Sequence, residues 1–110
     1  MILSDYQNQA AEFLFRGDNK TSDLLGLTLG VCGEAGELAE KIKKLYFNKE
    51  MKIDDQELSL ISKEIGDTLW YLALVAEELG LNLNEIAGQN LAKLESRRSR
   101  NVQKGEGDER

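Results

Sequence analysis

The chain has 110 residues, enough for one domain, and a net charge of −6 argues against a nucleic-acid binder, which would carry a basic face. The sequence contains no His and only one cysteine, Cys32, so imidazole-based catalysis and an internal disulfide are excluded. The absence of a disulfide pair fits a reducing compartment, and no apolar run approaches membrane length. We therefore expect a cytoplasmic protein with no nucleic-acid or membrane partner.

Residues that favour helices dominate the sequence, and four helices are predicted. The first is expected to begin near Ser4, because "SDYQ" has the Ser-x-x-Gln pattern of a capping box, and to end near residues 16–19. The second is expected over about residues 22–47.

The third predicted helix begins at Asp54 or Asp55, both suitable N-caps, and ends at Gly80, a residue common just after a helix. The fourth begins at Asn82 and runs to about Arg98.

We therefore expect an all-α fold of short-connected, antiparallel helices. Residues 1–98 are predicted to form a single domain, and residues 99–110 a disordered tail, because they are polar and contain glycine.

A carboxylate stripe is predicted on the second helix. At 100° per residue, Glu34 and Glu37 fall on one side, and Lys41 and Lys44 continue this stripe as candidate substrate-binding residues. An apolar stripe beside it is the predicted core face: Leu24, Leu27, Val31, Leu38, Ile42 and Leu45.

Glycines extend the carboxylate stripe toward the N-terminus at Gly26, Gly30 and Gly33. Each glycine inside a helix costs about 0.8–1 kcal/mol relative to alanine. We interpret them as residues that clear side chains from the face where a metal and a polyphosphate would approach.

The third helix repeats the acidic pattern, with Glu64 and Asp67 one turn apart and Tyr71 on the same stripe. Apolar residues flank this stripe on both sides. We expect Trp70 and Leu74 on one flank to need cover from a second chain, which predicts an oligomer.

Two acidic pairs on neighbouring antiparallel helices would bring four carboxylates together: Glu34, Glu37, Glu64 and Asp67. They would repel one another unless a cation were bound. Oxygen ligands without His or Cys favour Mg²⁺ or Mn²⁺, which complete their shell with water and substrate phosphate. Either pair alone would be read as ordinary surface charge, but the two together predict a metal site. Glu40 is expected to face solvent, and Cys32 to be buried and inert.

The motifs "GEAGELAEKIKK" and "EIGD", followed by "NLAKLESR", resemble the MazG-type branch of the all-α nucleoside triphosphate pyrophosphohydrolases over about residues 22–98. The resemblance implies a bundle completed as a dimer or tetramer. It also implies Mg²⁺-dependent hydrolysis of nucleoside triphosphates, including noncanonical or deoxy forms, to a monophosphate and pyrophosphate.

The resemblance assigns the four carboxylates as catalytic metal ligands. It places Tyr71 near the ligand and gives substrate contacts to Asn90, Lys93 and Arg97, which share one stripe of the fourth helix. Some relatives carry a base-stacking Trp ten residues after the first Glu, where this chain has Lys44. Base preference therefore stays open. Two alternatives also stay open, a phosphoribosyl-ATP pyrophosphohydrolase and a non-catalytic helical interaction protein.

Overall fold

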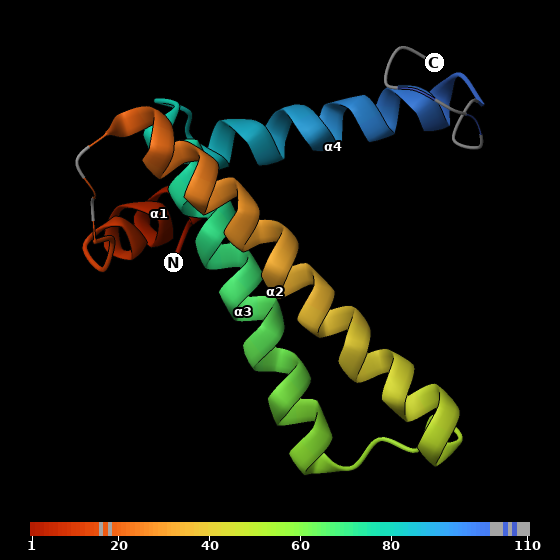
Figure 1. Ribbon diagram of the computed structural model, residues 1–110. Coiled ribbons are helices and arrows are strands. Elements are labelled where there is room, and N and C mark those ends of the chain that lie inside the picture. Colours follow the sequence, from red (N-terminus) through yellow and green to blue (C-terminus); the bar gives the residue numbers. More distant parts are fainter. Residues whose placement is uncertain (16, 18, 102–104, 106, 108–110) are drawn as a thin grey trace.

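A computed structural model describes residues 1–15, 17, 19–101, 105 and 107 of the chain. This part of the chain contains helices and no strand, which confirms the all-α prediction. The helices are α1 (Leu3–Ala11), α2 (Lys20–Lys49), α3 (Asp55–Glu78) and α4 (Leu83–Ser99) (Figure 1). None of these described helices has the length and apolarity needed to cross a membrane. Most of the predicted disordered tail lies outside the described residues.

The first helix differs from its prediction at both ends. The N-cap is Ile2, in extended conformation and without a side-chain cap, so the predicted capping box at Ser4 is wrong. Ser4 lies inside the first turn, where its backbone N donates to Oδ1 of Asn84 at 3.3 Å. A tertiary contact with the start of α4 thus replaces the local cap, and α1 ends at Ala11, before the predicted residues 16–19.

Side-chain caps define the starts of the other helices. Asn19 caps α2, two residues earlier than the prediction required, by accepting from the backbone N of Thr21 at 2.9 Å. Asp54 and Glu57 form a reciprocal capping box at α3, and Asn82 caps α4. The predicted starts of α3 and α4 are therefore confirmed.

Helices α2 and α3 form a long antiparallel hairpin, as predicted from their short connection (Figure 1). Helix α1 packs against α3 near the end of the hairpin where α2 begins, and α4 extends away from the hairpin. The connection between α2 and α3 turns through Glu50 and Met51, whose φ angles of 52° and 60° are left-handed. Such a conformation is uncommon for residues other than glycine.

The core lies where α1 meets α3. Leu74 has no exposed surface, and Trp70 is half-buried with its indole N–H donating to the carbonyl of Ala10 at 3.1 Å. Helix α1 therefore supplies cover that we had expected from a second chain. The apolar side chains left exposed are others, including Leu29 on α2 and Ile65 on α3.

Gln7 connects α1 to the turn between α3 and α4. Its side chain is 4% exposed and its amide N donates to Oε2 of Glu77 at 2.9 Å and to the carbonyl of Leu81 at 2.7 Å. Its amide O accepts from the backbone N of Leu83 at 2.8 Å. One buried side chain thus satisfies three polar groups that would otherwise lose their partners on leaving water.

We expect Gln7→Ala to lower the free energy of unfolding by about 1–3 kcal/mol, because it leaves buried polar groups without partners. Urea denaturation followed by circular dichroism measures this. Gln9→Ala, at an exposed position of the same helix, is the matched control and should change stability little. Equal stability of the two variants would contradict the role given to Gln7.

Candidate metal and substrate site

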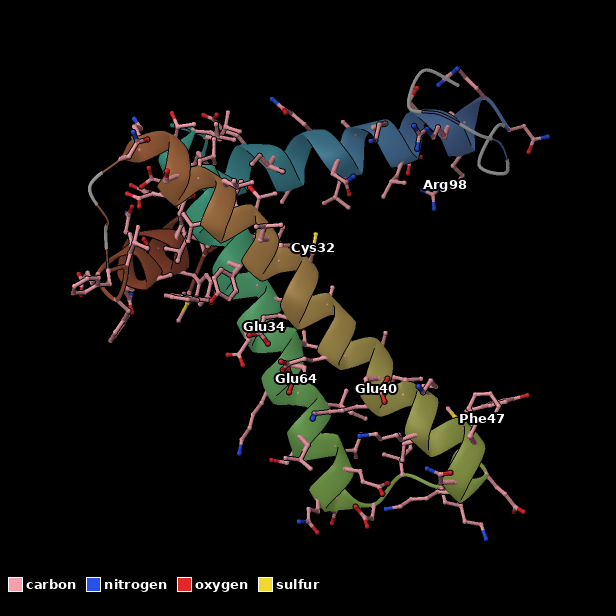
Figure 2. All side chains as sticks on the ribbon, in the orientation of Figure 1. Cys32, Glu34, Glu40, Phe47, Glu64 and Arg98 are labelled. Carbon is pink, nitrogen blue, oxygen red and sulfur yellow. The ribbon has the colours of Figure 1, made fainter. Side chains whose placement is uncertain are left out.

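An acidic cluster lies between the two helices of the hairpin. Helix α2 supplies Glu34 and Glu37, and α3 supplies Glu64; one carboxylate oxygen from each lies within 4.8 Å of the others. Figure 2 shows Glu34 and Glu64 directed into the space between the helices. The geometry therefore brings together three of the four predicted ligands. Asp67, one turn beyond Glu64, stands outside this triad but close enough for its charge to act on Glu34.

The cluster contains carboxylate oxygens that are buried without a partner. Oε2 of Glu34 and Oε2 of Glu64 have no hydrogen-bond partner among the described residues, and Glu64 is only 9% exposed. Burying an ionised oxygen in this way is unfavourable unless a cation or a proton compensates it. Oxygen donors at this spacing suit a hard divalent cation, so the residues present fit a metal ion.

The pKa values of the Glu34 and Glu64 carboxyl groups shift in opposite directions. Burial raises the pKa of Glu34, and its hydrogen bond with Glu64 and the charges of Glu37 and Asp67 raise this pKa further. Burial would also raise the pKa of Glu64, but hydrogen bonds from Lys41 and with its neighbouring carboxyls outweigh burial and lower it. Glu34 therefore releases its proton less readily than an isolated glutamate, and Glu64 releases its proton more readily.

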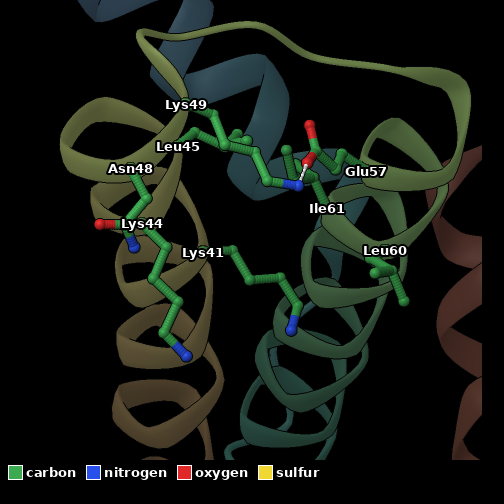
Figure 3. Close-up of a pocket in the computed structure, with 8 residues that line it drawn as sticks. All are labelled: Lys41, Lys44, Leu45, Asn48, Lys49, Glu57, Leu60 and Ile61. Carbon is green, nitrogen blue, oxygen red and sulfur yellow. Dashed lines mark hydrogen bonds and ion pairs between the residues drawn. The ribbon is translucent and has the colours of Figure 1, made fainter.

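A lysine-rich cavity of about 330 Å³ opens beside the cluster, between the end of α2 and the start of α3 (Figure 3). Lys41 lines it and places its Nζ 3.4 Å from Oε1 of Glu64. Lys44 also lines it, with Nζ 3.9 Å from Oε1 of Glu40. Both predicted stripe lysines thus border one cavity, which is cationic and could receive an anion.

An aromatic cavity of about 340 Å³ lies between the start of α2 and the second half of α3, and Phe13, Asp23, Trp70 and Tyr71 are among its lining residues. The rings of Trp70 and Tyr71 meet edge to face with their centroids 5.0 Å apart. Flat aromatic walls with a carboxylate beside them suit a planar, hydrogen-bonding group such as a nucleobase.

The glycines of α2 differ in the space that surrounds them. A methyl group at Gly26 or Gly33 would meet nothing within 4 Å, so their suggested role in clearing space for a ligand stays a prediction. Gly30 differs, because a methyl group there would lie 2.4 Å from Cε1 of Tyr71.

The predicted residues on α4 are not brought to the cluster within one chain, because α4 packs chiefly on α1 (Figure 1). Asn90 is exposed, Lys93 is half-buried, and Arg97 is buried with an Nη2–H donating to the carbonyl of Gly107 at 3.3 Å. Their predicted contacts with substrate stay predictions.

Two further expectations concern α2. Cys32 is exposed and points away from α3, so the prediction that it is buried is wrong (Figure 2). Glu40 is exposed, as expected, and pairs with Lys43 at 3.1 Å.

Sequence reasoning missed the outer walls of both cavities. Asn48 and Lys49 line the lysine-rich cavity, and Lys49 is paired with Glu57. Asn48 lies one turn beyond Lys44, so continuing the stripe by one turn would have found it. Phe13 had no such signal, because it follows the end of α1 and reaches its cavity through the tertiary fold.

Known proteins that are similar to this chain were found in two comparisons. A family model described as the MazG nucleotide pyrophosphohydrolase domain matches residues 23–102. The chain is also similar to the Gene 37 protein of Mycobacterium phage L5, with 37% identity over 114 aligned positions that cover 100% of both chains. No solved structure matches the chain.

The charge crowding at the cluster predicts a stabilising substitution. Because the pKa of Glu34 is raised in the folded chain, its contribution to stability is present at low pH and is lost as the pH rises through that raised value. Glu34→Gln removes this charge, so in the presence of a chelator it should melt at a higher temperature than the wild type at pH 7. The difference should shrink near pH 4, where the wild-type carboxyl is protonated.

Glu40→Gln is the control, because Glu40 is exposed and pairs with lysines. Calorimetric melting of Glu34→Gln below the wild type at neutral pH would contradict the electrostatic account.

Proposed function

The chain belongs to the MazG nucleotide pyrophosphohydrolase family and is a hydrolase of nucleotide pyrophosphate bonds; we propose that it uses Mg²⁺ to cleave nucleoside triphosphates between the α and β phosphates. The products are a nucleoside monophosphate and pyrophosphate. Noncanonical or deoxy nucleotides are the proposed substrates.

The convergence of Glu34, Glu37 and Glu64 carries this proposal, because two of the three have a buried oxygen without a partner in the described part of the chain. Such oxygens suit a divalent cation better than a surface ion pair. Asp67 joins these residues as the fourth proposed ligand, one helical turn from Glu64.

A bound Mg²⁺ would lower the pKa of an attacking water and neutralise charge that develops on the phosphoryl oxygens. The carboxylates of the cluster would hold that ion between α2 and α3, and the ion would supply the activated water that attacks the α phosphorus. A carboxylate not fully engaged in ligation accepts a proton from the water as it attacks. Asp67 stands outside the tight triad, so with one oxygen on the ion it would keep its second carboxylate oxygen for this task.

The two cavities on either side of the cluster support one orientation of the substrate. The β and γ phosphates lie toward Lys41 and Lys44, whose charges stabilise the departing pyrophosphate. The nucleoside lies toward Trp70 and Tyr71 at the aromatic cavity.

We further propose that the working unit is a homodimer or homotetramer. Leu29 is 59% exposed, Ile65 53% and Leu91 67%, so apolar surface on three helices lacks cover within one chain. Since α4 extends away from the hairpin, Lys93 would reach the substrate of a neighbouring chain rather than its own, and Arg97 would do so on leaving its contact with Gly107.

Pyrophosphate release tests the activity. Purified protein is incubated with canonical, noncanonical and deoxy triphosphates and with phosphoribosyl-ATP, each with Mg²⁺ or with a chelator. We expect release only with Mg²⁺, and Asp67→Asn should lower kcat at least a hundredfold, which is about 2.7 kcal/mol. Release that is unchanged by the chelator would contradict the metal-dependent mechanism.

A mixing experiment tests the contribution of α4 across chains. Lys93→Ala and Asp67→Asn should each be inactive or weak, and refolding them together should restore activity, because one type of mixed site carries neither change. The control mixture combines Asp67→Asn with Glu37→Gln; both residues are on one hairpin, so every site in this mixture stays defective. Equal recovery in the two mixtures, or none in the first, would refute the shared site.

A further inference from the structure

The ring of Tyr71 lies close against the backbone of Gly30, beside the acidic cluster. A methyl group placed on Gly30 would lie 2.4 Å from Cε1, 2.5 Å from Cδ1 and 2.7 Å from Cζ of Tyr71. Carbon atoms pack at about 3.5–4.0 Å, so the ring rests directly on the α2 backbone in space that only glycine leaves open.

This contact lies next to the carboxylates on both helices. Gly30 precedes Glu34 by one turn of α2, and Tyr71 follows Asp67 by one turn of α3. The ring also lines the aromatic cavity and meets Trp70 edge to face. Seating the ring against α2 therefore fixes a wall of the aromatic cavity at a set distance from the acidic cluster.

Other glycines of the hairpin make no such contact. Methyl groups at Gly36 on α2 and at Gly66 on α3 would meet nothing within 4 Å. The requirement for glycine at position 30 therefore comes from the Tyr71 ring and not from the packing of α2 against α3 in general.

We propose that Gly30 is a positioning residue for nucleotide binding: it admits the ring of Tyr71 against the α2 backbone and so holds that ring where the nucleoside of the substrate packs. This inference rests on the proposed function, because it assumes that the site binds a nucleotide. Gly30 acts only through Tyr71 and need not touch the substrate.

Binding of a non-hydrolysable probe tests the proposal apart from turnover. The probes are the α,β-methylene analogues of the four common deoxynucleoside triphosphates with Mg²⁺, measured by calorimetry. Gly30→Ala should weaken binding of the best probe at least tenfold, which is about 1.4 kcal/mol. Binding of Mn²⁺ alone, followed by electron paramagnetic resonance, should change less than twofold because the carboxylates are untouched.

Gly36→Ala is the matched control, with the same substitution on the same helix in open space, and it should bind the probe as the wild type does. The Gly30→Ala substitution is also made in a Tyr71→Ala variant, which lacks the ring. Once the ring is gone, adding Gly30→Ala should weaken probe binding no further, so the two changes should be strongly non-additive. If Gly30→Ala alone fails to fold, the double variant should recover folding.

Three results would overturn the inference. They are wild-type probe affinity in Gly30→Ala, equal loss of Mn²⁺ and probe binding, and additive losses in the double variant. Failure of the proposed function gives a different result, because the wild type would then release no pyrophosphate from any nucleotide. If the wild type binds a probe without turnover, the binding comparison still decides the role of Gly30; if it binds none, both proposals fail.

Discussion

Negative charge concentrated between two helices is the constraint on which the rest of this structure depends. Glu34, Glu37 and Glu64 face one another across the α2–α3 hairpin, and each would be better solvated if the helices separated. The hairpin therefore needs stabilisation from outside the cluster. Leu45 and Leu74, toward opposite ends of the hairpin, are buried and supply apolar contacts on either side of the charged stretch.

Local polar contacts complete this support. The ammonium of Lys41 gives Glu64 a positive neighbour at 3.4 Å, so part of the charge is balanced by the chain itself. At the end of the hairpin where α2 begins, the indole of Trp70 and the amide of Gln7 attach α1 to α3 and to the turn that follows. The contacts that hold the charged stretch are thus aligned along the hairpin, whereas α4 packs chiefly on α1 (Figure 1).

The sequence predicted those parts of the molecule that depend on spacing along one helix. The acidic pairs, the caps at Asp54 and Asn82 and the antiparallel hairpin all follow from local periodicity, and they are present. Predictions were wrong or incomplete where a segment distant in the sequence makes a contact. Ser4 contacts Asn84 rather than capping α1, and α1 supplies a contact to Trp70 that the sequence did not predict. Helical periodicity does not tell which face a distant helix will cover.

In the candidate site, too, features set by spacing along a helix were predicted and features set by tertiary packing were not. Three of the four acidic residues could be placed together from sequence, because each pair lies one turn apart and the helices had to be neighbours. The aromatic cavity could not, since Phe13 and Tyr71 meet only after α1 packs on α3. The sequence marks Gly30 as an unfavourable helix residue, but the Tyr71 ring that explains it lies on another helix.

The confinement of the acidic residues to one hairpin has an evolutionary consequence. All four carboxylates lie between residues 34 and 67, inside two helices that a single short gene segment encodes. Changes in α1 and α4, which flank this segment in the sequence, leave the spacing of the carboxylates unaltered as long as the contacts of Gln7 and Trp70 are kept. Selection could therefore change which molecule is recognised while the bond-breaking apparatus is inherited intact, and descendants could diversify at their ends faster than in their middle.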